Sequence, residues 1–378
     1  MGMSSIEVKK ANRNSILRYM LHNDIETKQR IAQALDLSIP TVTQGLKELQ
    51  EVGIVIPVGS MDSIGGRKAM GFRCVKDLKV AIGIDITPNH VNIVVVDLAL
   101  QVLYTKREPI RMKAARESYE ELHRFVECTI AESEIVRENI LGIGISLPAI
   151  IDESGMKILG MHEKMNISRS FYYEIKDYFE FPVILRNDAN CAALAELSMR
   201  KLNENKIYFF ISHSVGGAII TNEKIDEGQT SRAGEFGHMT LMPGGRSCYC
   251  GRNGCAGAYL STSILADAAG GLLEKFFSDL DSNPEYQKIW DEYLDYLSVA
   301  IHNLIMVFDR KIIIGGYLGQ YIDKHIMTLW KKIIRIDHYL DEFPVCIEPS
   351  ELKIEAASMG AAAVFTEQYL LSKEDIMR

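Results

Sequence analysis

Three cysteines and one histidine lie close together in a glycine-rich stretch, residues 234–261. Cys248, Cys250 and Cys255 follow the spacing C-x-C-x4-C, and His238 stands ten positions before the first of them. Three thiolates and one imidazole complete a tetrahedral zinc site and leave no position open for water. We therefore predict a structural zinc ion (Zn2+) held by these four side chains.

The alternatives to a metal site are a disulfide bond and scattered buried thiols. A disulfide is disfavoured because the chain shows no sign of secretion: charged residues stand near the N-terminus, where a signal peptide needs an apolar core. Scattered thiols would not explain a histidine at the entrance of a loop with glycines at positions 244, 245, 251 and 254. We expect a cytoplasmic protein without membrane insertion, since no apolar run approaches the length of a membrane span.

The same stretch resembles the signature of the ROK family (repressors, open reading frames and sugar kinases), G-E-x-G-H followed by C-x-C-G-x-x-G-C. The resemblance implies a two-lobed α/β body of the actin-like, hexokinase-like (ribonuclease H-like) kind, with a sugar pocket beside the zinc. It implies that Glu235 hydrogen-bonds sugar hydroxyls, and that His238 binds zinc through one nitrogen and faces the sugar with its other side. One position departs from the family pattern. Gly257 stands where the family usually has a sugar-contacting glutamate, which leaves the identity of the sugar open.

Asn187 and Asp188 follow a short apolar run and stand at the start of a predicted helix. Amides and carboxylates cap helix N-termini, so a purely structural role would account for the pair. The resemblance implies a second role, because the family's N-D-A-N motif places there the aspartate that accepts the proton of the attacking sugar hydroxyl. A repressor can keep that aspartate only to bind sugar. Asn166 falls near the position where the family often has a sugar-contacting asparagine.

Two turns that hold ATP phosphates in the family read differently here. The first is D-x-G-G-T in the family and Asp85-Ile86-Thr87-Pro88-Asn89 in this chain. The second, a G-T-G-x-G-x-G-like turn, reads S-H-S-V-G-G-A over residues 212–218. A phosphate cradle needs flexible glycines and free backbone N–H groups, and proline supplies neither. We therefore expect neither ATP nor Mg2+ as a cofactor.

The N-terminal residues show a separate pattern, with apolar positions at helical spacing in residues 12–21, 27–35 and 38–53. Thr27 and Ser38 are the expected N-caps of the second and third helices. Two β-like runs follow, residues 54–58 and 71–75. Three helices and a hairpin, with a short connection at residues 36–38, predict a winged helix-turn-helix.

The polar side chains expected to face DNA are on the third helix and on the tip of the wing: Thr41, Thr43, Gln44, Lys47, Arg67 and Lys68. The alternative is a helical interaction module or a dimerisation arm. The pattern T-V-T-Q-G-L-K-E-L followed by a wing resembles the head of ROK repressors, which favours DNA binding.

The charge of the chain is unevenly distributed. Its net charge is −8, but residues 1–76 carry eleven Lys and Arg against seven Asp and Glu, which leaves −12 on the remainder. An acidic body repels nucleic acid, so we expect DNA contacts only from the basic head.

We divide the chain into a winged helix-turn-helix, residues 1–77, and a ROK sugar-binding body of two α/β lobes, residues 78–378. The leading hypothesis is a sugar-responsive transcriptional regulator, most simply a repressor of carbohydrate-utilisation genes. It would bind a palindromic operator as a homo-oligomer (dimer or tetramer) and bind a sugar or sugar-phosphate effector without phosphorylating it.

Two other hypotheses remain. One is an ATP-dependent sugar kinase with a regulatory DNA-binding head, which the motif residues Asp188, Glu235 and His238 favour and which Pro88 and His213 in the phosphate turns oppose. The other is a constitutive DNA-binding protein that has also lost its sugar pocket, as Gly257 suggests.

Overall fold

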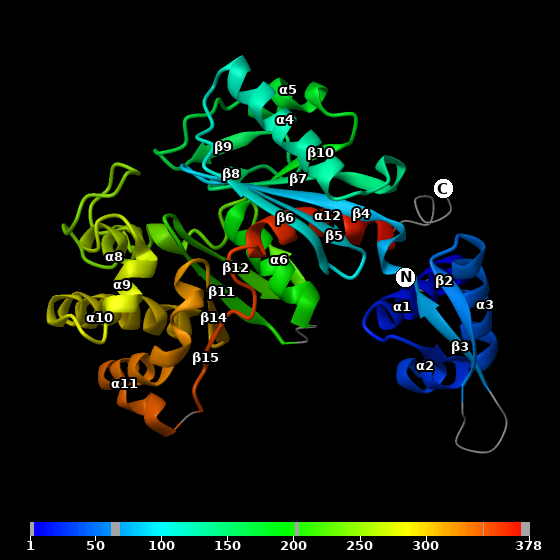
Figure 1. Ribbon diagram of the computed structural model, residues 1–378. Coiled ribbons are helices and arrows are strands. Elements are labelled where there is room, and N and C mark those ends of the chain that lie inside the picture. The colour runs from blue at the N-terminus through cyan, green and yellow to red at the C-terminus, as the bar shows by residue number, and fades with distance from the viewer. Residues whose placement is uncertain (1–3, 62–68, 201–203, 343, 372–378) are drawn as a thin grey trace.

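The structure is a computed structural model that describes residues 4–61, 69–200, 204–342 and 344–371. It consists of a small N-terminal head and a larger body built around two sheets (Figure 1). Arg67 and Lys68, the predicted wing-tip contacts, lie outside the described residues.

In its described residues, 4–61 and 69–77, the head contains three helices and a three-stranded antiparallel sheet of order β1-β3-β2. Its elements are α1 (Ser5–Leu21), β1 (Glu26–Thr27), α2 (Lys28–Leu35), α3 (Ile39–Glu51), β2 (Val55–Met61) and β3 (Ala69–Cys74). Thr27 and Ser38 accept backbone N–H bonds at the starts of α2 and α3, as N-caps do. Helix α1 begins earlier than predicted because Ser4 and Glu7 form a capping box.

The first lobe of the body has a sheet of order β10-β7-β4-β5-β6. Its strands are β4 (Val80–Ile86), β5 (Val91–Asp97), β6 (Val102–Glu108), β7 (Ile140–Leu147) and β10 (Val183–Asn187). The first three form an antiparallel meander, and β7 and β10 continue the sheet in parallel with β4. Helices α4 (Arg116–Glu132) and α5 (Phe171–Ile175) cover one face, and a hairpin of β8 (Ala149–Ile151) and β9 (Ile158–Met161) follows β7.

The second lobe repeats this plan with a sheet of order β13-β12-β11-β14-β15. Its strands are β11 (Lys206–Ile211), β12 (Val215–Thr221), β13 (Lys224–Asp226), β14 (Lys311–Gly315) and β15 (Ile347–Pro349). Again an antiparallel meander is followed by two parallel strands. One face packs on α10 (Pro284–Phe308) and α11 (Ile326–Ile336), and α7 (Gly257–Leu260), α8 (Ser263–Ala268) and α9 (Leu273–Asp279) lie before α10 in the chain.

Two helices lie between the sheets, α6 (Asp188–Arg200) and α12 (Ala356–Leu371) (Figure 1). They touch so closely that a Cβ at Gly360 would lie 1.7 Å from the carbonyl oxygen of Cys191. A Cβ at Gly83 of β4 would lie 1.8 Å from the carbonyl oxygen of Ser358 in α12. Because neither position has room for a side chain, α12 is held tightly against both the first sheet and α6.

The apolar core of the head continues into the body. Leu17, Leu46 and Leu49 of the head helices are fully buried in the same cluster as Tyr369 and Leu370 from the last turn of α12. The first turn of α12 lies at the other end of this helix, which is 16 residues, or about 24 Å, long. One helix therefore reaches from between the lobes to the head. No helix in the described part of the chain is long and apolar enough to cross a membrane.

Candidate functional site

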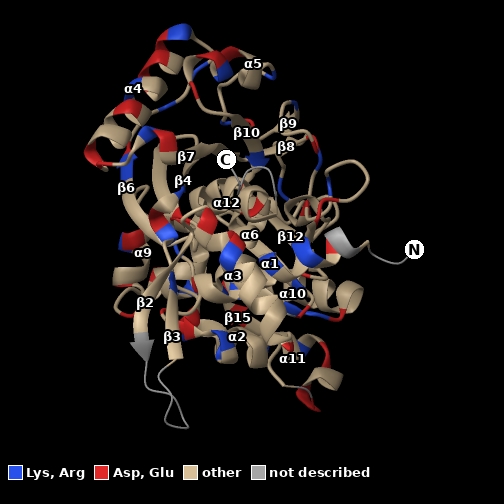
Figure 2. Ribbon diagram, turned by 90° about the vertical axis from the view of Figure 1, so that its right-hand side faces the viewer, with Lys and Arg blue, Asp and Glu red and all other residues tan. Residues whose placement is uncertain are grey.

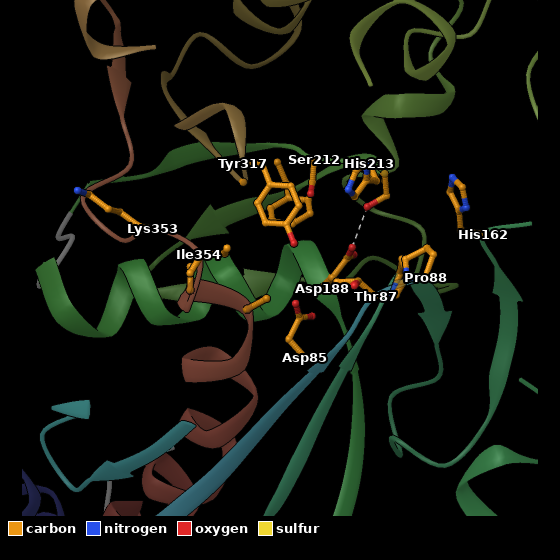
Figure 3. A pocket seen from close by; sticks show the side chains of 16 residues that line it. Asp85, Thr87, Pro88, His162, Asp188, Ser212, His213, Tyr317, Lys353 and Ile354 are labelled. Carbon is orange, nitrogen blue, oxygen red and sulfur yellow. Dashed lines mark hydrogen bonds between the residues drawn. The ribbon is translucent and has the colours of Figure 1, made fainter. Parts of the chain in front are cut away.

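A cleft opens between the two lobes, with an empty volume of about 550 Å³ that includes its solvent-open part (Figure 3). Residues from both sheets and from α6 and α12 line it: Asp85, Thr87, Pro88, Pro148, His162, Asp188, Phe210, Ser212, His213, Ser214, Gly316, Tyr317, Lys353, Ile354, Ala356 and Ala357. The cleft therefore brings together the two turns that correspond to the family's ATP-phosphate turns and the predicted sugar-contacting Asp188.

Two buried carboxylates face this cleft. Asp188, the first residue of α6, accepts a hydrogen bond from the hydroxyl of Ser214 at 2.9 Å (Figure 3). Asp85, near the end of β4, accepts one from the hydroxyl of Ser146 at 2.8 Å. Burial raises the pKa of Asp85 to about 6; burial and the negative charge of Asp85 raise the pKa of Asp188 to about 7. Near neutral pH these groups can both accept and donate hydrogen bonds, as recognition of hydroxyls requires.

The two predicted asparagines differ in their surroundings. The side chain of Asn187 donates to the carbonyl oxygen of Ala149 at 3.0 Å and accepts from the backbone N–H of Asn190 at 2.9 Å. Asn187 therefore has the structural role of capping the start of the helix. Asn166 is exposed, forms a backbone bridge with Lys113, and is not among the described residues that line the cleft.

Glu235 and His238 lie at the two ends of a short 3-10 turn, η4 (Phe236–His238). The Oε2 atom of Glu235 is 3.8 Å from Nε2 of His238. Burial raises the pKa of Glu235 and lowers that of His238. Tyr249 connects this pair with the cleft, because its hydroxyl lies 3.1 Å from His238 Nε2 and its ring packs on His162, which lines the cleft.

The four predicted metal ligands converge. The ligating atoms of His238, Cys248, Cys250 and Cys255 all lie within 4.8 Å of one another. His238 Nδ1 is 3.8 Å from Cys248 Sγ, and the Sγ atoms of Cys250 and Cys255 are 3.6 Å apart. Corners of a tetrahedral zinc site are about 3.5–3.8 Å apart, whereas a disulfide needs about 2.0 Å. The donor set therefore fits a metal ion better than it fits a disulfide.

The loop between these ligands turns sharply at Gly254. Its φ is +85°, and a Cβ there would lie 1.8 Å from the carbonyl oxygen of Met242. Only glycine fits this position, and it allows Cys255 to return to the same cluster as Cys250. The ring of His238 meanwhile presents Nδ1 to the cysteines and Nε2 to Glu235.

The first of the two altered turns is closed on itself. The backbone N–H of Thr87 donates to the carbonyl oxygen of His90 at 2.9 Å, and the N–H of His90 donates to the Thr87 hydroxyl oxygen at 3.1 Å. Pro88 has no N–H to offer. Most of the donors that could surround a phosphate are therefore absent from this turn or already used within it.

In the second altered turn, the imidazole ring of His213 lies among the residues that line the cleft. The backbone N–H of Ser212 donates to the carbonyl oxygen of Ser214 at 2.8 Å. His213 places its Nδ1 3.1 Å from the hydroxyl of Ser263 and packs edge-on against Tyr317, with ring centroids 5.5 Å apart (Figure 3). Aromatic side chains thus stand where a phosphate-binding turn would present backbone N–H groups.

The sequence pattern did not single out four residues that the structure places at or beside the cleft: Asp85, His162, Tyr249 and Tyr317. Asp85 had a signal, since it opens the first altered turn. Tyr249 had one as well, because it stands between two predicted metal ligands. His162 and Tyr317 had none, since their partners are distant in the sequence.

Comparison with known proteins covers most of the chain. Residues 81–368 match the ROK family. The xylose repressor of Caldicellulosiruptor bescii is 25% identical, over 96% of this chain and 97% of its own. A solved ROK family transcriptional regulator, described as a homologue of the Escherichia coli MLC protein, has a TM-score of 0.75 at 20% identity and covers 98% of both chains.

A ROK family glucokinase from Streptomyces griseus, solved with glucose and AMPPNP, has a TM-score of 0.63 at 20% identity. It covers 75% of this chain and 98% of its own. The likeness to both structures confirms the predicted two-lobed α/β fold, which a regulator and a kinase share. With the family match extending over both lobes, the chain belongs to the ROK family.

Proposed function

We propose that this protein is a sugar-responsive transcriptional repressor that binds its effector between the lobes without phosphorylating it. The observation that carries the proposal is the combination, in one chain, of a helical head and a cleft with altered phosphate turns. The full-length likeness to a xylose repressor and to a ROK transcriptional regulator supports it. We accordingly take carbohydrate-utilisation genes as its targets and D-xylose as the first effector to test.

The head supports DNA binding as a winged helix-turn-helix, with α3 as its recognition helix. Gln44 and Lys47 are exposed on α3, and Thr41 and Thr43 are half-buried. Gln44 contacts Glu48 at 3.0 Å, and Lys47 lies 3.8 Å from Glu51. Such exposed contacts between neighbouring turns are weak, so DNA phosphates can replace them. Two copies of the head would read a palindromic operator, which requires a homo-oligomer.

Acidic groups limit the DNA-binding surface to the head. Figure 2 shows acidic and basic residues interspersed along α4 of the body, without a continuous basic surface on that helix. The body carries most of the negative charge of the chain. It would therefore repel a duplex that approached it, and so orient the head toward DNA.

We assign effector binding to Asp188, Glu235 and His238, supported by Asn187. Asp188 lines the cleft, and Tyr249 connects Glu235 and His238 with it. Together these side chains offer carboxylates and a ring nitrogen, the groups that hydrogen-bond sugar hydroxyls. Asn166 is a weaker member of the set because it is exposed. A Cβ at Gly257 would lie 3.2 Å from the carbonyl oxygen of Gly237, so the missing glutamate leaves little extra space at the backbone itself.

We assign the cluster of His238, Cys248, Cys250 and Cys255 to a structural zinc ion. When bound, zinc supplies a tetrahedral cross-link and no open position for catalysis. The protein's own residues then perform the recognition. The cross-link fixes the loop, and the loop holds His238 with Nε2 toward Glu235.

Helix α12 is the route by which we connect effector and DNA. Ala356 and Ala357, in its first turn, line the cleft. Tyr369 and Leu370, in its last turn, are buried in the core of the head. A sugar that changes the position of the lobes therefore shifts a helix on which the head rests, and with it the spacing of two heads on an operator.

The test uses the full, zinc-loaded protein and a duplex selected from random DNA by repeated binding. The expected result is specific binding that weakens when D-xylose or another sugar of a panel is added. Robust ADP release that depends on Asp188 would instead establish a kinase. Specific DNA binding that no sugar changes would favour a constitutive DNA-binding protein.

A further inference from the structure

We infer that the Tyr249 hydroxyl competes with an effector hydroxyl for Nε2 of His238, so that Tyr249 determines which sugars the site accepts. The inference rests on the proposed function, because it concerns the effector site of a sugar-responsive regulator. It adds a residue that is outside the family-derived sugar-binding set.

The first step is the geometry around His238. Its Nδ1 faces the cysteine cluster, 3.8 Å from Cys248 Sγ, so only Nε2 remains for a ligand. The hydroxyl of Tyr249 lies 3.1 Å from that Nε2, at hydrogen-bond distance. Glu235 Oε2 lies 3.8 Å from the same atom. A tyrosine hydroxyl thus holds the position from which a sugar hydroxyl would contact His238 beside the carboxylate.

The second step is the attachment of Tyr249. Its two neighbours in sequence, Cys248 and Cys250, both belong to the metal-site cluster, so a bound metal ion would fix the backbone at this point. The residue remains 40% exposed, so its ring can turn away from His238 without unfolding a core. The backbone of Tyr249 would therefore stay in place while a sugar hydroxyl replaces the hydrogen bond between the Tyr249 hydroxyl and His238.

The third step is that the ring of Tyr249 joins the two lobes. It packs on His162, which follows strand β9 of the first lobe, with ring centroids 4.3 Å apart. It also meets the ring of His238 edge-on at 5.2 Å. An effector that takes Nε2 therefore displaces a group that contacts both lobes, at the edge of the cleft.

Selectivity follows from the difference between two hydrogen bonds. A sugar whose hydroxyl fits between His238 and Glu235 replaces the bond from Tyr249 with its own. A sugar without a hydroxyl at that corner leaves Tyr249 in place and gains nothing there. Discrimination between sugars is a difference of affinities. Tyr249 contributes to that difference because each sugar must replace its hydrogen bond to His238.

The test is Tyr249→Phe, which removes the hydroxyl and keeps the ring that packs on His162. We expect the variant to bind D-xylose roughly fivefold more tightly in calorimetry, the effect of one net hydrogen bond. Tyr339→Phe is the matched control, because Tyr339 is 86% exposed, and it should bind D-xylose as the unaltered protein does. Zinc content, measured for each protein, shows that the loop is intact.

A series of monodeoxy-xyloses supplies the second readout. The analogue that lacks the hydroxyl reaching His238 should bind Tyr249→Phe and the unaltered protein equally, while the others keep the gain. Equal or weaker binding of every sugar by Tyr249→Phe would overturn the inference and leave the proposed function standing. If neither protein bound any sugar of a pentose and hexose panel, the proposed effector site would fail and the inference with it.

Discussion

Arg18, in the first helix of the head, pairs with Glu367, in the last helix of the body, 349 positions away in the sequence. Both guanidinium Nη atoms donate to the carboxylate, and the contact lies at the rim where the apolar core of the head meets α12. The side chain of Arg18 remains 46% exposed, so water and salt screen the attraction. The pair therefore stabilises the fold weakly, and its geometry makes it suited to fix the angle between head and body.

We predict that Glu367→Gln separates the effect of this pair on stability from its effect on the angle between head and body. The free energy of unfolding should fall by less than about 1 kcal/mol, as for other exposed ion pairs. The change in DNA affinity caused by the effector should shrink, because the head is less firmly tied to α12. Urea unfolding and DNA titrations with and without D-xylose measure the two quantities. Glu132→Gln is the control, since it removes the partly exposed Lys106–Glu132 pair within the first lobe. A full effector response in Glu367→Gln would contradict the coupling role.

Parts of this molecule could be predicted from local sequence and parts could not. Thr27 and Ser38 signalled the helix starts, because capping is decided by the next three residues. The metal-site cluster could be predicted because its ligands lie within one short loop. Strand β1, two residues long, was not predicted, since it depends only on pairing with β3.

Contacts across the cleft had no local signal. The negative charge of Asp85 helps to raise the pKa of Asp188, although the two residues lie on different elements far apart in the chain. The pairing of Tyr249 with His162 likewise depends on how the second lobe packs against the first. The family resemblance identified motif residues one by one, but it gave no information on residues outside those motifs. The packing of the head core on α12 also had no local signal, because it joins the two ends of the chain.

A second prediction concerns the metal. Protein purified without added zinc should contain about one equivalent, because four ligands converge at suitable distances. Cys255→Ser should lose the metal and melt at a lower temperature, since Cys255 is buried and its loop depends on the cross-link. Metal analysis and thermal unfolding provide the measurements. Cys128→Ser, which changes an exposed thiol outside the cluster, should retain both properties. A protein without metal and with four reactive thiols in its folded state would refute the site.

A third prediction follows from the raised pKa of Asp188. Its folded-state pKa, about 7, lies above the usual 3.8, so folding favours the protonated acid. The stability from this group is fully present below the unfolded-state pKa and is lost as pH rises through the folded-state pKa. Between about pH 5 and pH 7 the free energy of unfolding should therefore fall.

The amide of Asp188→Asn resembles the protonated acid. The free energy of unfolding of this variant should therefore fall less over the same pH interval. Each unit of pKa difference corresponds to about 1.4 kcal/mol, so urea unfolding at the two pH values can resolve the effect. Asp281→Asn, at an exposed position, is the control, and its free energy of unfolding should depend on pH as that of the unaltered protein does. An identical pH dependence of Asp188→Asn and the unaltered protein would show that the carboxyl is ionised throughout.

A fourth prediction concerns α3, the proposed recognition helix. Lys47→Ala should weaken binding to every duplex and reduce the salt dependence by about one phosphate contact, because Lys47 is exposed on α3. Anisotropy titrations at several salt concentrations measure the slope. Lys331→Ala removes an exposed lysine from α11 of the body and should leave the slope unchanged. Unaltered DNA affinity after removal of residues 1–77 would exclude the head as the binding domain.

The last prediction is that no sugar that binds is phosphorylated. Phosphoryl transfer depends almost entirely on donors and metal placed around the phosphates. In the first turn Thr87 and His90 use their N–H groups on each other and Pro88 has none. In the second, the ring of His213 packs against Tyr317 among the residues that line the cleft.

A coupled assay with ATP, Mg2+ and D-xylose or D-glucose should show ADP release no faster than without sugar. Asp188→Asn supplies the decisive comparison, because Asp188 is the only residue to which the family motif assigns a proton-accepting role in this chain. Turnover that disappears in Asp188→Asn would mean that the closed turns open to admit ATP, and would make the protein a kinase. Background release that is equal in both proteins leaves Asp188 with hydroxyl recognition alone, which agrees with its burial and its bond from Ser214.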